Sequence, residues 1–160
     1  MVTIEELDNW KAMMVLLRLR QADRDEASAQ MHAWDMDNIE KLAATMQQTP
    51  YAFCAVRDRE PVMVFGATPY SANGVIGWSL ATDRYKRVMP AVTRFCLGPM
   101  RTQLCRDGYT WLEARALENN AEALAWLERL GVNPVTPLKS YGKNGETFVL
   151  CRRIEDVHRA

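Results

Sequence analysis

Apolar positions follow a helical period in some stretches of the chain and a period of two in others, and these changes predict its helices and strands. Residues 3–14 carry apolar side chains at helical spacing behind an acidic first turn, which predicts a helix that Thr3 caps. Residues 15–20 alternate instead, so we expect a strand there with one buried face.

Two further helices are expected before the next strand. Asp23 followed by Glu26 matches the capping-box pattern and predicts the start of the first. Asp35 and Asp37 can each cap the second, which is predicted over residues 38–48 and must end before the proline that follows.

The middle of the chain alternates at a period of two in three consecutive stretches, which predicts an antiparallel meander over residues 51–57, 61–67 and 74–82. A long helix is expected next, capped by Asp83 and covering residues 84–107. Gly98 and Pro99 interrupt it, and because proline has no backbone N–H, we expect a kink or a break at this point.

A strand, a helix and a hairpin are predicted at the end of the chain. Residues 110–117 alternate, Asn120 then precedes an amphipathic stretch, and Gly131 ends that stretch. A final hairpin is expected over residues 132–141 and 146–153, around an Asn-Gly turn.

This order of elements predicts an α/β (α+β) mixed sheet with helices on both faces, because a β-α-β unit within it requires a parallel crossover. The chain has 160 residues, of which 48% are hydrophobic and 25% charged, and no linker or repeat divides it. We therefore expect a single domain over residues 1–160, with residues 1–14 as a short helical extension.

Charge and hydropathy exclude several classes of protein. Twenty Lys and Arg balance twenty Asp and Glu, and a general nucleic-acid binder would carry a basic excess. The apolar run of residues 12–17 is too short to span a bilayer and lacks the basic start of a signal peptide. No nucleic-acid or membrane partner and no secretion by a signal peptide are expected.

Metal and disulfide chemistry are not expected either. The four cysteines contain no CxxC pair and lie in apolar or helical contexts, which favours reduced, buried thiols. The two histidines, His32 and His158, have no ligand partner at a spacing that a metal site would use.

The late stretch ENNAEALAWLERLGVNP carries a family resemblance. Its Asn opening, apolar helix and Leu-Gly-Val stop resemble the corresponding part of the GNAT acyltransferases, and LRLRQADRDEASA resembles the start of that fold. The positions are Asn120, Ala123, Trp126, Leu130, Gly131 and Val132. The resemblance covers the chain from residue 15 onward and implies a GNAT-like fold.

A narrower resemblance rests on VFGA, GWSLAT and WLEARALENN followed by LERLG. This combination is similar to the internal virion protein A family of short-tailed phages, whose members are morphogenesis proteins with a GNAT-like fold. It implies a bacteriophage protein that acts in virion assembly, located in the host cytoplasm or in the virion.

The GNAT resemblance also implies a site for the pyrophosphate of acetyl-CoA in the loop after the fourth strand, where glycines let the backbone approach the phosphates. In this chain residues 80–95 contain no glycine, and Asp83 adds a negative charge. Arg84, Lys86 and Arg87 could hold an anion by their side chains, but a solvated helix face is the favoured interpretation.

Catalytic groups of the GNAT pattern are not found at their expected positions. The resemblance places a tyrosine general acid where this chain has Leu127, which cannot transfer a proton. Tyr109 or Tyr141 could substitute for it. Glu113 and Glu146 lie on predicted strands and are candidate bases, although alternation predicts that Glu113 is exposed to solvent.

Two functional hypotheses follow. The first is a catalytically inert GNAT-like virion protein that acts through protein–protein contacts with other phage structural or assembly proteins, with no cofactor, no catalytic residue and the option of a homo-oligomer. The alternative is an acyl-CoA-dependent N-acetyltransferase with an atypical cofactor loop. In that case acetyl-CoA would contact Ser79, Leu80, Ala81, Arg87 and Asn120.

Overall fold

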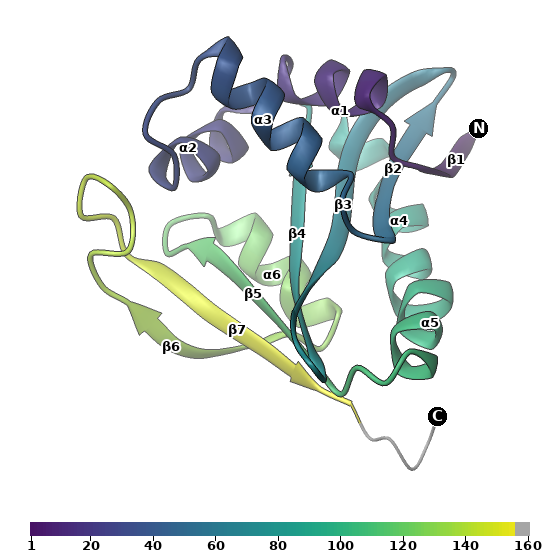
Figure 1. Ribbon diagram of the computed structural model, residues 1–160, viewed down its shortest axis with the longest axis vertical. Coiled ribbons are helices and arrows are strands. Elements are labelled where there is room, and N and C mark those ends of the chain that lie inside the picture. The colour runs from purple at the N-terminus through teal and green to yellow at the C-terminus, as the bar shows by residue number, and fades with distance from the viewer. Residues whose placement is uncertain (156–160) are drawn as a thin grey trace.

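The computed structural model describes residues 1–155, and its strands form one seven-stranded mixed sheet in the order β1-β2-β3-β4-β5-β7-β6 (Figure 1). The predicted α/β mixed sheet with helices on both faces is confirmed. His158, considered above as a metal ligand, lies outside the described residues.

The first four strands form an antiparallel meander. They are β1 (Val2–Glu6), β2 (Tyr51–Arg57), β3 (Glu60–Ser71) and β4 (Gly74–Ala81). The predicted bounds of β2 agree with the structure, and β3 continues four residues beyond the prediction. A positive φ at Asp58 and Arg59 closes the β2–β3 hairpin, as two-residue turns of this kind require.

The second half of the sheet is built from β5 (Trp111–Leu117), β7 (Phe148–Ile154) and β6 (Asn133–Leu138), which pair antiparallel in that order. Among the strands of residues 1–155, only β4 and β5 pair in parallel, and they join the two halves. In Figure 1 the strands β5, β7 and β6 run at an angle to β4, so the two halves of the sheet diverge toward one end.

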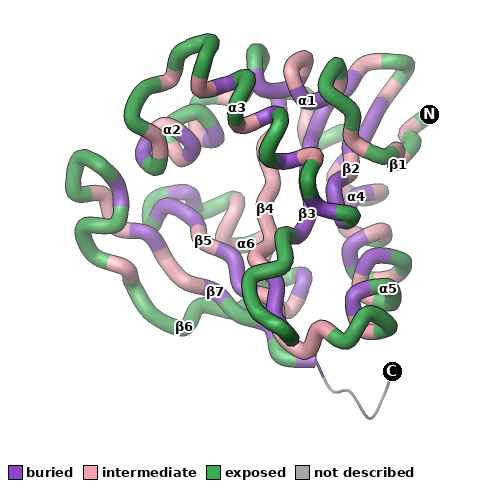
Figure 2. Tube along the Cα trace, viewed as in Figure 1, coloured by how far each residue is buried: buried purple, intermediate pink, exposed green. Residues whose placement is uncertain are grey.

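Helices cover both faces because side chains alternate along each strand. On one face α1 (Asn9–Leu16) and α3 (Met36–Met46) pack on Cys54, Val56 and Val64. On the other face, α4 (Met89–Phe95), α5 (Arg101–Arg106) and α6 (Ala121–Arg129) pack on the alternate positions. α2 (Gln21–Ala29) lies on the same face as α1 and α3, where it packs on Leu117 of β5 and Phe148 of β7. Figure 2 shows the buried residues concentrated along the central strands, whereas β6 is exposed along most of its length.

The prediction for the N-terminus was wrong. Residues 2–6 form the edge strand β1 rather than a helical extension, and residues 15–20 contain the end of α1 rather than a strand. Pairing with β2 stabilises β1 through backbone hydrogen bonds, and the helix begins only at Asn9, where the Asp8 carboxylate caps the Lys11 N–H at 2.8 Å. Of the predicted strand, Leu19 keeps an isolated bridge to Thr82.

Two predicted caps are present and three are not, because Thr3 lies within β1 and caps no helix. Asp35 caps α3 through the Asn38 N–H at 2.9 Å, and Asn120 caps α6 through the Ala123 N–H at 3.3 Å. Asp23 does not cap α2, because its carboxylate accepts a hydrogen bond from β4 instead. Asp83 is exposed and caps nothing; the chain makes a 3-10 turn, η1 (Tyr85–Arg87), before α4 begins.

The expected break at Pro99 is a π-helical turn. Residues η2 (Cys96–Met100) connect α4 to α5 without ending the helix, because the widened turn accommodates a residue that lacks an N–H. Gly131 adopts a φ of +78° after α6, so the predicted glycine stop is confirmed. The last hairpin has a longer connection than predicted, from residue 139 to residue 147.

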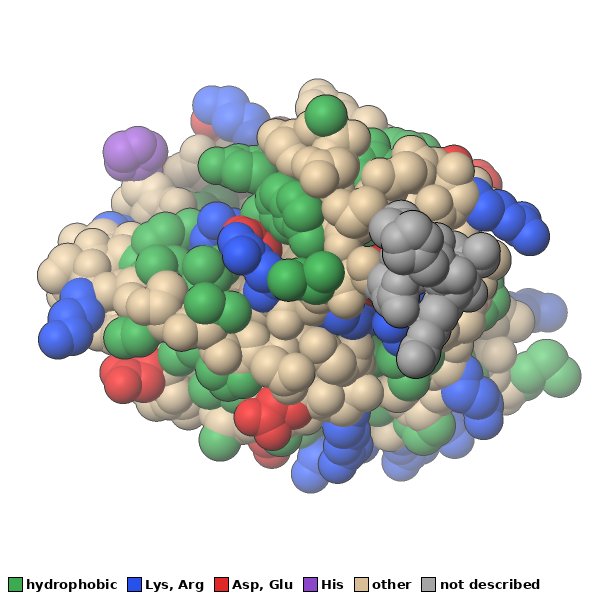
Figure 3. All heavy atoms as spheres, turned by 90° about the horizontal axis from the view of Figure 1, so that it is seen from below, with side chains coloured by type: hydrophobic (Ala, Val, Ile, Leu, Met, Phe, Trp, Pro, Cys, Tyr) green, Lys and Arg blue, Asp and Glu red, His purple; other side chains and the backbone are tan. Residues whose placement is uncertain are grey.

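Charges of both signs are spread over the surface. On the face seen in Figure 3, outside the part covered by grey atoms, Lys and Arg are interspersed with acidic and hydrophobic side chains. Within residues 1–155 no helix is long and apolar enough to cross a membrane, and no three His, Cys, Asp or Glu side chains are grouped to hold a metal ion. All four cysteines are free thiols, and burial raises the pKa of Cys54 and of Cys96 to about 12.

Candidate functional site

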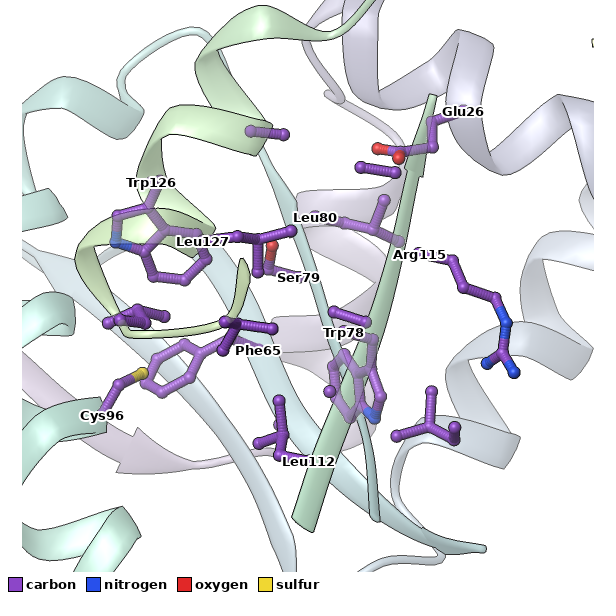
Figure 4. Close-up of a pocket in the computed structure, with 18 of the residues that line it drawn as sticks. Glu26, Phe65, Trp78, Ser79, Leu80, Cys96, Leu112, Arg115, Trp126 and Leu127 are labelled. Atoms are coloured by element: carbon purple, nitrogen blue, oxygen red, sulfur yellow. The ribbon is translucent and has the colours of Figure 1, made fainter. Parts of the chain in front are cut away.

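The divergence of β4 from β5 creates a cleft in the middle of the sheet. The two strands pair only at Gly74–Ile76 of β4 with Trp111–Glu113 of β5. Beyond these residues their facing edges form no backbone pairs with each other. A cavity of 380 Å³ lies at this divergence, with β4, β5, α2 and α6 among its walls. Figure 4 shows that side chains from both faces of the sheet surround it.

The open edge of β4 carries hydrogen-bonding backbone groups. At its end the Ala81 N–H donates to the Asp23 carboxylate at 2.7 Å, and the Ala81 carbonyl accepts from the Arg20 N–H at 3.0 Å. Backbone groups alternate along a strand, so the N–H and C=O of Ser79, two residues earlier, point toward the same edge. Ser79 lines the cavity, and its backbone groups therefore face it.

The open edge of β5 is occupied by Glu26 from α2. The Glu26 carboxylate accepts the Leu117 N–H at 2.8 Å and the Asn120 side-chain amide at 3.3 Å. Burial raises the pKa of Glu26 from 4.5 to about 7; the nearby Asp23 carboxylate adds to this shift, and the Leu117 N–H opposes it. Glu26 lines the cavity and has the pKa of a proton acceptor that works near neutral pH.

A cluster of charged and aromatic side chains lies across one entrance of the cleft, between η1 and α6. Arg20 donates to Asp23 and to Glu122, each at 2.9 Å, and its guanidinium lies 4.5 Å from the centre of the Tyr85 ring. The Tyr85 hydroxyl donates to Glu122. We call Arg20, Tyr85 and Glu122 the entrance brace; it borders a second cavity of 50 Å³ that shares Ser79 and Trp126 with the main one.

The loop after β4 has the composition noted in the sequence but no phosphate cradle of glycines. Arg84, Lys86 and Arg87 are all exposed, on and just before a 3-10 turn rather than on the predicted helix. Arg84 pairs with Glu60 of β3, and Val88 is fully buried beneath the loop. Basic side chains are therefore available at this end of the cleft, whereas a close backbone approach is not.

The α6 wall of the cleft is apolar. Leu127, at the position of the expected acid, lines the cavity, and Trp126 beside it donates its Nε1–H to Thr93 at 3.0 Å. Among the substitute tyrosines, Tyr141 lines the cavity and is exposed. Tyr109 does not line it; its ring packs edge-on against Tyr51 at 5.9 Å.

The predicted cofactor contacts are only partly brought together. Ser79 and Leu80 line the main cavity, and Ala81 borders the smaller one with its backbone groups already bonded to α2. Arg87 lies on the exposed loop, and the side chain of Asn120 is engaged by Glu26 and by its own helix.

The two candidate bases that the sequence placed on strands, Glu113 and Glu146, do not line the cavity. Glu113 is only 6% exposed, so the prediction of an exposed residue was wrong; Arg152 of β7 reaches across the strand pair and binds it. Glu146 accepts the Asn144 N–H at 2.7 Å in the last connection. The sequence did single out Glu26, but as part of a cap, and gave no signal for its role at the cleft.

No protein-family model and no curated protein matches the sequence. Solved structures match it over nearly its whole length. The Escherichia coli ribosomal-protein-S18-alanine N-acetyltransferase has 19% identity and a TM-score of 0.70, covering 98% of this chain and 96% of that one. The yncA protein of Salmonella typhimurium, solved with its cofactor acetyl-CoA, has 15% identity and a TM-score of 0.67, covering 99% and 96%.

A GNAT-family acetyltransferase of Streptococcus pneumoniae has 10% identity and a TM-score of 0.66, covering 98% of this chain and 100% of that one. These similarities establish that the chain has the GNAT acetyltransferase fold. At such identities they establish the fold alone, because one fold hosts sites of different chemistry.

Proposed function

We propose that this protein is an N-acyltransferase that transfers an acyl group from an acyl-CoA thioester to an amine. The observation that carries the proposal is Glu26, a half-buried carboxylate with a pKa raised to about 7, at the wall of an open cleft between two unpaired strand edges. An amine must lose a proton to attack a carbonyl carbon, and a carboxylate of this pKa is suited to accept it at neutral pH.

The residues of the cleft suit the two ends of acyl-CoA differently. The apolar wall of Leu127 and Trp126 and the backbone of Ser79 suit an extended arm with amide groups. The pyrophosphate would meet Lys86 and Arg87 by their side chains, since the loop offers no glycine. When bound, acyl-CoA supplies an activated acyl group.

Each remaining role falls to residues of the chain. Glu26 accepts the proton of the amine and is oriented by the Leu117 N–H. The Ser79 N–H is directed into the cavity, where it can donate to a carbonyl oxygen and stabilise negative charge on it. Leu127 cannot donate a proton, and of Tyr109 and Tyr141 only Tyr141 lines the cavity, so its hydroxyl is the candidate acid.

The test is a transfer assay that detects free CoA thiol, run with purified protein, acetyl-CoA and a panel of primary amines. We expect turnover above the protein-free background, rising with pH through about 7 as Glu26 loses its proton. Glu26→Gln removes the base and should lower kcat by roughly 10²–10⁴-fold with little change in acetyl-CoA binding. Turnover that is unchanged in this variant would refute the role of Glu26.

The inert virion protein remains the second candidate. The glycine-free loop favours its lack of a cofactor, because the loop offers phosphates no close backbone approach. Isothermal titration with acetyl-CoA separates the two proposals. Saturable binding supports the acyltransferase, and no binding in the millimolar range supports a scaffold that acts through protein–protein contacts.

A further inference from the structure

One wall of the cleft carries an arginine that neither the fold nor the proposed reaction accounts for. Arg115 of β5 lines the cavity. Its neighbour Ala114 packs in the core beneath α4, α5 and α6, so alternation along β5 directs Arg115 to the opposite face. In Figure 4 Arg115, Trp78 and Glu26 lie on one side of β4 and β5, and Trp126 and Leu127 lie on the other.

The Arg115 guanidinium is held only loosely by the protein. Its closest carboxylate contact is Glu113 Oε2 at 3.8 Å, which is too long for a hydrogen bond, and its side chain is 23% exposed. Among residues 1–155 no side-chain hydrogen bond from Arg115 is formed, whereas Arg152 and Arg153 each bind a carboxylate directly. The Arg115 guanidinium therefore has N–H donors left for a ligand in the cleft.

The charges around Arg115 favour a ligand with one negative charge. Glu113 contacts both Arg115 and Arg152, so these three side chains together carry a net charge of +1. A carboxylate matches the planar guanidinium and supplies a single charge. A phosphate dianion would bring its second charge close to Glu113 and Glu26, which disfavours it.

We infer that the acceptor is an amine with a carboxylate at its far end, with the amino group at Glu26 and the carboxylate at Arg115; this inference rests on the proposed function. Glu26 binds the N–H of Leu117, two residues beyond Arg115, so the two anchor points on β5 are about 7 Å apart. Figure 4 shows the Arg115 side chain extending away from Glu26, which lengthens this separation. A single amino acid spans about 3.5 Å and each further residue adds about as much, so peptides of two or more residues with a free carboxyl end fit better than single amino acids.

Binding of the carboxylate can be tested without any acyl donor. Calorimetric titrations of N-acetylglycylglycine and of its neutral analogue N-acetylglycylglycinamide would be compared on the wild-type protein. A charge-assisted hydrogen-bond pair predicts that the acid binds roughly tenfold to hundredfold more tightly than the amide. Equal affinities, or no saturable binding of the acid, would overturn the inference.

Variants locate the effect. Arg115→Gln should bind both probes as weakly as the wild type binds the amide, and Arg115→Lys should keep part of the preference because it keeps the charge. Arg24→Gln is the matched control, since Arg24 is exposed on α2 outside the cavity and changes the net charge equally. A preference for the acid that survives in Arg115→Gln, with its thermal unfolding unchanged, would place the carboxylate elsewhere and refute the site.

A transfer assay with acetyl-CoA then separates this inference from the proposed function. Glycylglycine should be used at least about tenfold more efficiently, by kcat/KM, than glycylglycinamide, and Arg115→Gln should remove the difference. Equal use of both amines refutes the carboxylate site but not the acyltransferase. Transfer to no amine, with the preference for the acid intact in calorimetry, refutes the acyltransferase and leaves an anion-binding cleft.

Discussion

Replacing Glu26 with Gln should stabilise the fold at alkaline pH while it slows the proposed reaction. The pKa of Glu26 is raised from 4.5 to about 7, so its contribution to folding stability is fully present below about pH 4.5 and is lost as pH rises through about 7. The difference of about 2.5 pH units corresponds to about 3 kcal/mol above pH 7. Gln keeps an acceptor for the Leu117 N–H but never ionises.

The measurement is urea unfolding of the wild type and of Glu26→Gln at about pH 4 and about pH 9. From about pH 4 to about pH 9, the free energy of unfolding of the variant should gain about 3 kcal/mol relative to that of the wild type. At about pH 9 the variant should therefore gain roughly 6–12 °C in its midpoint of thermal unfolding relative to the wild type. Comparing the change in the gap cancels every other titrating group. Glu128→Gln, on the exposed side of α6, is the control and should show no such change. A gap that is the same at both values of pH would refute the raised pKa and with it the assignment of Glu26 as the base.

Three further substitutions test the architecture of the cleft. Gly66→Ala places a Cβ 2.1 Å from the Tyr51 carbonyl oxygen and should lower the free energy of unfolding by about 1–3 kcal/mol. Gly98→Ala is the control and should not lower it, because no neighbour lies within 4 Å of the added Cβ. Equal effects of the two variants in urea unfolding would contradict the close approach of Gly66 to Tyr51. Asn120→Ala removes the cap of α6 and a donor to Glu26 and should cost about 0.5–2 kcal/mol, measured against Asn119→Ala, which lacks both contacts. Glu122→Gln weakens the entrance brace and removes a negative charge from it, so acetyl-CoA should bind a few-fold more tightly in calorimetric titration. Glu128→Gln on the same helix is the control and should leave the affinity for acetyl-CoA unchanged.

Local signals predicted those parts of the fold that local interactions determine. Strands β2, β3 and β4, the caps at Asp35 and Asn120 and the glycine stop at Gly131 depend on residues a few positions apart. The N-terminus was mispredicted because residues 2–6 fit either period, and pairing with β2, some fifty residues later, makes them a strand. Such pairing leaves no trace in the local pattern.

The site shows the same limit more sharply. Asp23 and Glu26 match a capping box in sequence, yet Asp23 binds the backbone of β4 and Glu26 binds the N–H of a residue 91 positions away. Burial then raises the pKa of Glu26, and burial is a property of the assembled cleft. Ser79 and Leu80 could be placed at the cleft only through the family resemblance. The sequence could not predict that Arg115 lacks a side-chain hydrogen bond, because this depends on Glu113 binding Arg152 more closely than Arg115.

The three parallel pairs between β4 and β5 also bear on how the molecule unfolds. Residues 2–81 complete one antiparallel sheet and residues 111–154 complete another, and beyond these pairs α2 connects them by placing Asp23 on one strand edge and Glu26 on the other. A backbone ladder holds each half, and the junction beyond the three pairs is held by one apolar core that both halves share and by these two titratable side chains. The backbone amides at the open strand edges are therefore expected to exchange with solvent before those of either ladder in native-state hydrogen exchange. The protonation of Glu26 can then bias how far the two edges separate while the shared core stays packed.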